Sequence, residues 1–163
     1  GIKVGITRHT QIPTRWIDQG AVQALPIIKV QSRYVSGLVE VAIANHINDK
    51  TSWQRMLKNQ VQEVDLKAKR DELLQICADD FNGVVQKFGS QAMGLLSDPS
   101  VVNIEYPVEK YPEKVKSFNL DKVPEVSGIL QGIKGQYLIL DTGVINIRKY
   151  GGYEVEWGAA SQG

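Results

Sequence analysis

The sequence predicts an α+β fold, in which a small α/β module is followed by a helical segment and then by a small antiparallel β-barrel. Three observations predict it. Strand-length apolar runs alternate with helical patterns over the first fifty residues, and one long apolar stripe with helical spacing comes next. After Asp98 and Pro99 the apolar residues recur with a period of two, in short runs separated by Gly, Pro and Asp. The expected divisions are residues 1–50, 51–95 and 96–158, followed by a disordered tail over residues 159–163.

The first module is predicted to contain two strands and two helices. In order, we expect a buried strand over residues 2–7, a short helix over residues 15–19, a strand over residues 24–32 and a helix from residue 36 to about residue 49. Pro13 and Thr14 suit the start of the short helix, and Gly20 suits its end. Ser36 is the expected N-cap of the second helix, whose apolar residues recur at helical density.

The middle segment is predicted to be helical. Thr51 or Ser52 is the expected cap of a short helix, and Asp65 then opens the longest helix of the chain, which Gly89 ends. The apolar stripe of this helix repeats at intervals of 7, 4, 4, 3 and 4 residues, at Leu66, Leu73, Cys77, Phe81, Val84 and Phe88. Because Cys77 lies within the stripe, we expect it to be a small buried hydrophobic residue and not a nucleophile.

The last part of the chain is predicted to consist of short strands. They are expected over residues 101–106, 115–120, 126–130, 136–140, 144–149 and 153–157. Asp141, Thr142 and Gly143 imitate half of an aspartic-protease site, but that chemistry needs two such loops with paired carboxylates. A polar turn between two strands explains them better.

Composition limits the classes of protein that the chain can represent. It has 163 residues, 42% hydrophobic and 23% charged, so a real core is expected. No apolar run reaches the roughly 18–20 residues that would cross a membrane, and no secretory leader is present, so we expect a cytoplasmic protein without a membrane partner. The single cysteine excludes an internal disulfide and fits a reducing compartment.

Basic residues are unevenly distributed along the chain. The net charge is only +1, yet residues 1–36 carry five basic side chains and one acidic side chain. Such a basic edge suits contacts with the phosphates of DNA or RNA, although solvated Lys and Arg are a commoner explanation. The candidate nucleic-acid-binding residues are Arg8, Lys29 and Arg33 in the first module and Lys134, Arg148 and Lys149 in the β region. Tyr137 and Tyr150 lie beside the second group and could stack on bases, although aromatic rings in small barrels usually form the core.

A short motif over the first third of the chain resembles the GIY-YIG endonuclease superfamily. It consists of Lys3, Val4 and Gly5, then Arg15, and then Glu40 within the segment 37–46. The match is to the branch in which the second motif begins with lysine, and the order is strand, helix with arginine, strand, and helix with glutamate.

This resemblance implies a Mg²⁺-dependent phosphodiesterase. By analogy with the family, Arg15 would contact phosphate and Glu40 would hold the Mg²⁺ ion. A guanidinium offers permanently charged donors to phosphate oxygens, and a carboxylate with water ligands suits Mg²⁺. Lys3 stands where many members have the second tyrosine, and His9 could take over proton transfer because its ordinary pKa lies near neutrality. The candidate catalytic residues are therefore Arg15, Glu40, Lys3 and His9.

The chain departs from the superfamily at its start. The first motif, with its catalytic tyrosine, would precede residue 1, and Gly1 to Thr7 already resemble a strand, so we expect an upstream segment. Residues 14–20, 116–122 and 132–148 also resemble a family of uncharacterised bacterial proteins, which implies a cysteine-rich, zinc-binding segment upstream. Within this chain, His9, His46 and one cysteine are too few for a zinc site.

Three functions remain open at this point. The first is a GIY-YIG-like nuclease, and the second is a non-catalytic module that binds nucleic acid or joins a ribonucleoprotein assembly. The third is a protein–protein adaptor whose barrel forms the interface. The sequence does not indicate an oligomeric state.

Overall fold

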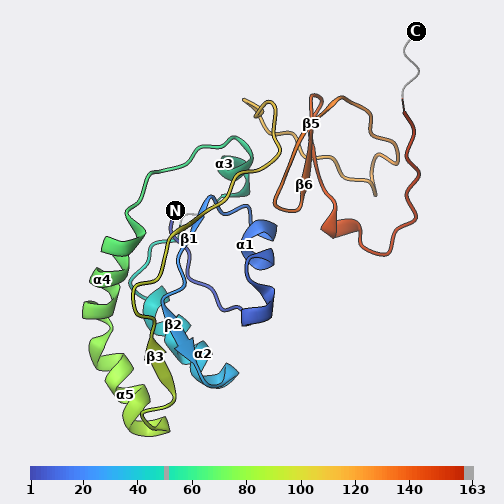
Figure 1. Ribbon diagram of the computed structural model, residues 1–163. Coiled ribbons are helices and arrows are strands. Elements are labelled where there is room, and N and C mark those ends of the chain that lie inside the picture. The colour runs from blue at the N-terminus through green and yellow to red at the C-terminus, as the bar shows by residue number, and fades with distance from the viewer. Residues whose placement is uncertain (50–51, 160–163) are drawn as a thin grey trace.

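The computed structural model describes residues 1–49 and 52–159, which form two lobes joined at a narrow junction (Figure 1). The helical lobe contains β2 (Ile28–Val30), α2 (Arg33–Ala44), α4 (Leu66–Ile76), α5 (Ala78–Phe88) and β3 (Met93–Leu95). The sheet lobe contains β5 (Leu130–Lys134), β6 (Tyr137–Leu140), β7 (Val144–Asn146) and the 3₁₀ helix η2 (Arg148–Tyr150). Between the lobes lie η1 (His9–Gln11), α1 (Thr14–Asp18), β1 (Gln23–Ala24), α3 (Trp53–Leu57) and β4 (Val102–Asn103). The mixture of helices and small antiparallel sheets confirms the α+β prediction.

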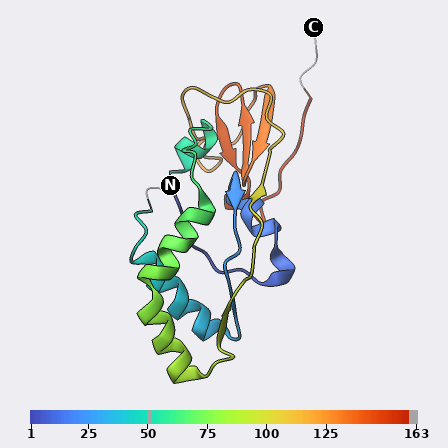
Figure 2. The same cartoon turned by 60° about the vertical axis from the view of Figure 1, so that its left-hand side comes forward.

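The core of the helical lobe lies between α2 and the α4–α5 pair, which run side by side in both views (Figure 2). On α2, Val35, Val39 and Ile43 recur at intervals of four residues and are all buried. This spacing places them on one face of the helix. They pack with Leu73, Cys77, Phe81 and Ala92, so the central part of the predicted stripe faces the core, whereas Phe88 at its end is exposed.

The helix α2 begins four residues earlier than the sequence pattern predicts. Ser32 is its N-cap, and the Ser32 hydroxyl accepts a hydrogen bond from the backbone N–H of Val35 at 3.2 Å. Ser36 is instead buried inside the first turn, where its hydroxyl donates to the carbonyl of Arg33 at 2.6 Å. Both serines can cap a helix, and the prediction chose the wrong one. The helix also ends earlier than expected, at Ala44.

The predicted long helix is two helices joined at Cys77. Asp65 caps α4 as predicted, since its carboxylate accepts from the N–H of Ala68 at 3.1 Å. Gly89 follows α5 with a φ of 97°, which confirms the predicted end. Cys77 ends α4 and precedes α5, yet its N–H and carbonyl both keep hydrogen bonds of four-residue spacing across the joint. The apolar stripe therefore continues on one face while the helix axis changes direction.

The strands of the first module differ from the prediction. Residues 2–7 form no strand, and residues 24–32 contain two short strands separated by Pro26. The strand β1 pairs with β4, and β2 pairs with β3, both antiparallel. The strand β3 was not predicted, because three residues with a central glycine give little periodicity. Each pair joins segments that are far apart in the sequence, which local patterns do not reveal.

The sheet lobe contains a three-stranded antiparallel sheet in the order β5-β6-β7, and within the described ranges 1–49 and 52–159 no closed barrel is present. Ile139 and Val144 have no exposed surface and pack with Leu57 of α3. Residues 115–120 contribute a single bridge, from Ser117 to Val144, and residues 153–157 contribute no strand. The barrel prediction was therefore wrong, because strand-like periodicity does not ensure a pairing partner.

The turn between β6 and β7 confirms the structural reading of residues 141–143. The Asp141 carboxylate accepts from the N–H of Ile129 at 2.7 Å, and the Thr142 hydroxyl donates to the carbonyl of Ser127 at 2.8 Å. These side chains hold the segment before β5 against the turn.

The predicted cap at Thr51 and residues 160–163 of the predicted tail lie outside the described residues. Within the described part of the chain, no helix is both long and apolar enough to span a membrane.

A close backbone contact at Gly132 gives a test of the sheet lobe. A Cβ atom at this position would lie 2.7 Å from the Cα of Val108, which bridges to Gly132. Gly132→Ala should therefore lower the free energy of unfolding by about 1–3 kcal/mol, the usual cost of overpacking. Gly94→Ala is the control, because a Cβ there meets nothing within 4 Å. Chemical denaturation of both variants measures the difference, and equal stability would contradict the contact.

Candidate functional site

The four candidate catalytic residues lie on separate segments of the helical lobe and junction. Lys3 is exposed in the irregular leading segment, His9 is exposed in η1, and Arg15 is exposed on α1. Glu40 is half-buried on α2. Within residues 1–49 and 52–159, no hydrogen bond or ion pair joins any two of these side chains. Arg15 and Glu40 are thus available to a ligand, but no direct contact orients them toward each other.

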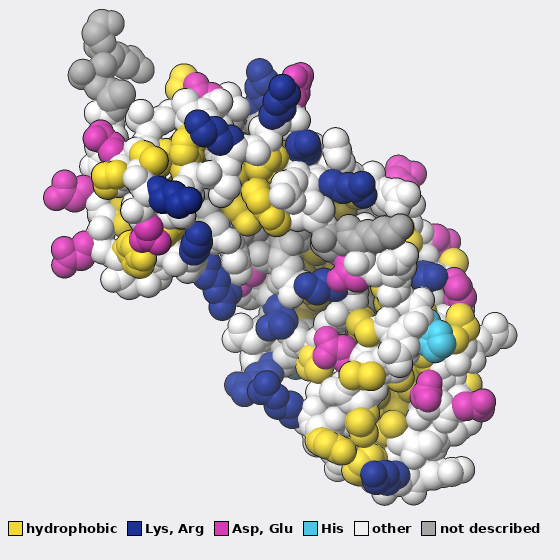
Figure 3. All heavy atoms as spheres, turned by 180° about the vertical axis from the view of Figure 1, so that it is seen from behind, with side chains coloured by type: hydrophobic (Ala, Val, Ile, Leu, Met, Phe, Trp, Pro, Cys, Tyr) yellow, Lys and Arg dark blue, Asp and Glu magenta, His cyan; other side chains and the backbone are white. Residues whose placement is uncertain are grey.

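Exposed basic side chains of the sheet lobe lie near those of the junction segment that contains α1. Figure 3 shows Lys and Arg side chains following the waist of the molecule on one face, between the two lobes. The guanidinium of Arg148 lies 3.9 Å from the carboxylate of Asp18 on α1. Asp18 follows Arg15 by three residues on α1, so the side chains of Arg15 and Asp18 are neighbours on the surface of this helix. We call the exposed residues Arg8, Arg15, Arg148 and Lys149, which belong to or adjoin η1, α1 and η2, the basic edge. The other two exposed candidates, Lys29 on β2 and Arg33 at the start of α2, lie in the helical lobe.

Lys134 does not belong to the basic edge. Its side chain has no exposed surface, so the prediction that it contacts nucleic acid does not fit its position. The ammonium group donates to the carbonyl of Met56 at 3.0 Å and to the side-chain oxygen of Asn59 at 3.2 Å. It also lies 5.4 Å from the ring centroid of Tyr106 and 5.0 Å from that of Tyr111. Burial lowers the pKa of Lys134, and these four groups compensate the enclosed charge.

The aromatic candidates for base stacking are engaged within the protein. The ring of Tyr137 stacks on that of Trp53 with a centroid distance of 5.7 Å and an angle of 5° between planes. Tyr150 is buried, and its hydroxyl accepts from the N–H of Leu120 at 3.0 Å. Both rings therefore take part in packing within the protein. This was the alternative to base stacking that the sequence left open.

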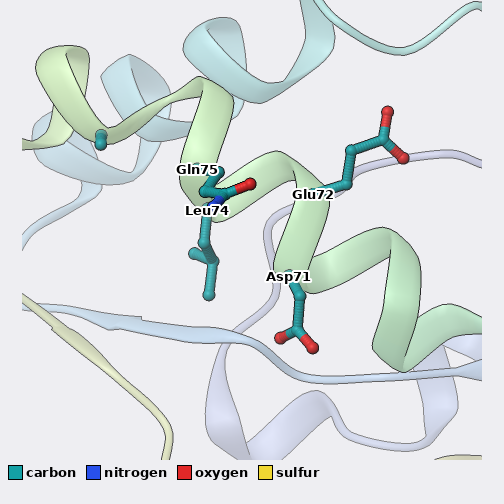
Figure 4. Close-up of a pocket in the computed structure, with 5 residues that line it drawn as sticks. Asp71, Glu72, Leu74 and Gln75 are labelled. Carbon is teal, nitrogen blue, oxygen red and sulfur yellow. The ribbon is translucent and has the colours of Figure 1, made fainter.

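Among the described residues, two hollows of the helical lobe stand out, and neither of them is lined by a candidate catalytic residue. The first is an open hollow of about 450 Å³ on α4, lined by Asp71, Glu72, Leu74, Gln75 and Ala78 (Figure 4). In this view Asp71 and Leu74 project to the same side of the helix, whereas Glu72 points away. Each carboxylate already forms an ion pair. Arg70 Nη2 lies 2.9 Å from Asp71 Oδ1, and Lys69 Nζ lies 3.2 Å from Glu72 Oε2. The second hollow, of about 260 Å³, is lined mostly by apolar side chains of α4, α5 and β3.

A group of potential metal ligands lies elsewhere on the helical lobe, and the sequence pattern missed it. His46, Cys77 and Asp80 place one ligand atom each within 4.8 Å of one another. Counting only histidine and cysteine could not find this group, because its third member is a carboxylate from the neighbouring turn of α5. The only local sequence feature that indicated the group was the spacing of three residues between Cys77 and Asp80, which places two side chains on the same side of a helix.

The fold and the surface define a small α+β protein with a basic edge at the junction of its lobes. A family model described as "Protein of unknown function (DUF2797)" matches residues 1–155, so the chain belongs to the DUF2797 family. No curated protein matches the chain, and no solved structure matches it either.

The surroundings of Tyr106 give a pH-dependent test of the junction. The Tyr106 hydroxyl donates to the carbonyl of Ala21 at 2.7 Å. Burial, with smaller contributions from Tyr111 and Asp18, raises the pKa of Tyr106 from 10.0 to about 12. The neutral phenol therefore stabilises the folded state fully below the unfolded-state pKa of 10.0, and this stabilisation is lost as the pH rises through about 12.

Ultraviolet absorbance of tyrosinate should show a late titration step in the folded protein. We expect Tyr106→Phe to remove the step near pH 12, and Tyr34→Phe, which changes an exposed ring, to retain it. Circular dichroism on the same samples reports whether the chain is still folded. A folded protein whose late step survives in Tyr106→Phe would contradict this assignment.

Proposed function

We propose that this protein binds nucleic acid through the phosphate backbone, along the basic edge. The observation that carries the proposal is the approach of exposed basic side chains at the junction, where Arg148 of η2 lies beside α1, which also presents Arg15. Phosphates follow one another along a strand, so a receptor benefits from several cations spread along an edge.

The low net charge supports a local interaction. At +1, the whole molecule attracts polyanions weakly, so affinity would depend on the arrangement of a few cations. Arginine suits this role because its guanidinium remains charged and offers several donors to phosphate oxygens. Binding of this kind weakens steeply with added salt, because cations condensed on the nucleic acid are released on binding.

Arg15→Gln and Arg148→Gln should each weaken binding to fluorescently labelled DNA and RNA oligonucleotides. Each change should also reduce the slope of log affinity against log salt by about 1, as expected for one lost phosphate contact. Lys87→Gln is the control, because it removes one positive charge from the last turn of α5, distant from the junction. Fluorescence anisotropy over a series of salt concentrations measures both quantities.

Absence of salt-sensitive binding to any of these oligonucleotides would contradict the proposal and favour the adaptor function. Equal losses in Lys87→Gln and in the two arginine variants would show that only total charge matters. That result would also contradict a specific role for the basic edge.

A second candidate function is Mg²⁺-dependent cleavage of the bound strand. The position of Glu40 favours it, because this carboxylate is half-buried on α2 and makes no hydrogen bond or ion pair with the described residues. A carboxylate in such a position could hold Mg²⁺ together with water ligands. The GIY-YIG resemblance assigns this role to Glu40 and phosphate binding to Arg15, while Lys3 and His9 would lie beside the substrate.

In this mechanism the side chains and the Mg²⁺ ion would have different roles. Arg15 would bind and orient the scissile phosphate, and its charge would oppose the negative charge that develops during attack. His9 would accept or return a proton at its imidazole. When bound, Mg²⁺ would supply Lewis-acid stabilisation of a phosphate oxygen.

Glu40→Gln should abolish Mg²⁺-dependent cleavage and leave salt-sensitive binding intact, because the substitution removes the metal-binding charge and keeps the shape of the side chain. Glu63→Gln, an exposed change outside the helices, is the control. Gel analysis of labelled DNA and RNA with and without Mg²⁺ measures cleavage. Cleavage that persists in Glu40→Gln rejects the metal role of this residue, and binding without any cleavage favours the non-catalytic module.

A further inference from the structure

The joint between α4 and α5 brings three side chains with metal-ligand chemistry to one place. Cys77 lies at the joint, and Asp80 lies three residues later in the first turn of α5. The spacing of three residues places both side chains on the same side of the helix. His46 comes from the end of α2, the helix that packs against α5. The ligand atoms of all three residues lie within 4.8 Å of one another.

The packing of α2 against the joint explains why the histidine reaches the thiol. The Cys77 thiol donates to the carbonyl of Ala42 at 3.6 Å, so the sulfur faces α2 directly. His46 follows Ala42 by four residues, which is about one further turn along the same side. Cys77 is fully buried, whereas His46 and Asp80 are exposed, so the group has a buried base and a solvent-facing rim.

The rim side chains are uncommitted within residues 1–49 and 52–159. Neither the imidazole of His46 nor the carboxylate of Asp80 makes a hydrogen bond or an ion pair there. An acidic residue in the first turn of a helix is favoured by the helix dipole, which suffices to explain Asp79 and Asp80 as a pair. The dipole does not explain why Asp80 also lies beside a buried thiol and an imidazole.

The chemistry of the three donors suits a divalent cation, because two of them carry negative charge when they bind a metal. A divalent cation balances both negative charges, and neutral His46 adds a ligand without changing that balance.

We propose that His46, Cys77 and Asp80 form a zinc site that links the end of α2 to the α4–α5 joint. Sulfur, nitrogen and oxygen donors at one site suit Zn²⁺, which accepts all three. Tetrahedral coordination places neighbouring ligand atoms about 3.4–3.6 Å apart, so the exposed side chains need to move by only about 1 Å. Binding replaces the thiol proton, which passes to solvent, and a water molecule occupies the fourth position.

This site is separate from the Mg²⁺ position proposed at Glu40, and it has different chemistry. It ties together the end of α2 and the start of α5, two segments of the helical lobe that are more than thirty residues apart in the sequence. Metal bound to the folded state alone raises thermal stability by mass action. The site therefore stabilises the helical lobe, and its exposed rim leaves the metal open to solvent.

Titration of the 163-residue chain with Zn²⁺ and with Co²⁺, under reducing conditions, tests the site directly. We expect one metal ion per chain, a higher melting temperature with Zn²⁺, and a thiolate-to-cobalt charge-transfer band with Co²⁺. Because Cys77 is the only cysteine of the chain, such a band can arise from this residue alone.

Variants of the two exposed ligands separate this site from nonspecific binding. His46→Gln and Asp80→Asn should each weaken Zn²⁺ binding at least about tenfold, since loss of even an outer partner often costs that much. The matched controls are His9→Gln, the other histidine, and Asp79→Asn, the preceding aspartate of the same helix turn. Both should bind Zn²⁺ as the unmodified chain does. Cys77→Ser should lose the cobalt band, and the exposed variants carry the test if this core change prevents folding.

Three results would overturn the proposal. They are the absence of saturable Zn²⁺ binding, a Co²⁺ complex without a sulfur band, and equal losses in the matched controls. Glu40→Gln should keep Zn²⁺ binding unchanged, so failure of the zinc site and failure of the cleavage function are distinguishable.

Discussion

The enclosed ammonium group of Lys134 ties the sheet lobe to the junction. It belongs to β5 of the sheet lobe, and its hydrogen-bond acceptors are Met56 and Asn59, at the end of α3. An unpaired buried charge would cost several kcal/mol, so the cation fixes the position of every group that compensates it. The rings of Tyr106 and Tyr111 also surround the ammonium group. The hydroxyl of Tyr106 in turn donates a hydrogen bond to the carbonyl of Ala21, just after α1. Lys134 thus links the sheet directly to α3 and, through Tyr106, to the segment just after α1.

The glycines at the junction show how close this approach is. A Cβ at Gly20 would lie 2.6 Å from the sulfur of Met56, and one at Gly135 would lie 3.2 Å from the carbonyl of Asp18. Both residues also have positive φ angles, of 72° and 61°, that glycine adopts at little cost. Gly135, in the turn between β5 and β6, therefore lies against Asp18 at the end of α1. The guanidinium of Arg148 lies near the carboxylate of the same residue. The proposed basic edge therefore depends on the junction, because Arg148 and Lys149 belong to the sheet lobe whereas Arg15 lies on α1.

The helices could be predicted from the sequence far better than the strands. Capping at Asp65, the end at Gly89 and the buried stripe through Leu73, Cys77 and Phe81 are local features, and the structure confirms them. The strands needed partners distant in the sequence, such as β1 with β4 and β2 with β3, and no local pattern identifies those partners. Periodicity alone therefore predicted strands where none formed, at residues 2–7 and 153–157, and a barrel where a three-stranded sheet formed.

The sequence by itself determined the α+β composition, the main helices, the buried cysteine and the excess of basic residues near the start, because these follow from composition and short-range spacing. Only the tertiary structure decided which charges are enclosed and which are exposed. Lys134 and Arg148 look alike in a sequence, yet one is buried between aromatic rings and the other is exposed beside α1. The meeting of His46 with Cys77 and Asp80 was equally invisible, because it depends on how α2 packs against a bent pair of helices. Whether a side chain is buried, and which side chains lie beside it, depends on packing between segments that are distant in the sequence. These two properties decide what a given side chain can bind.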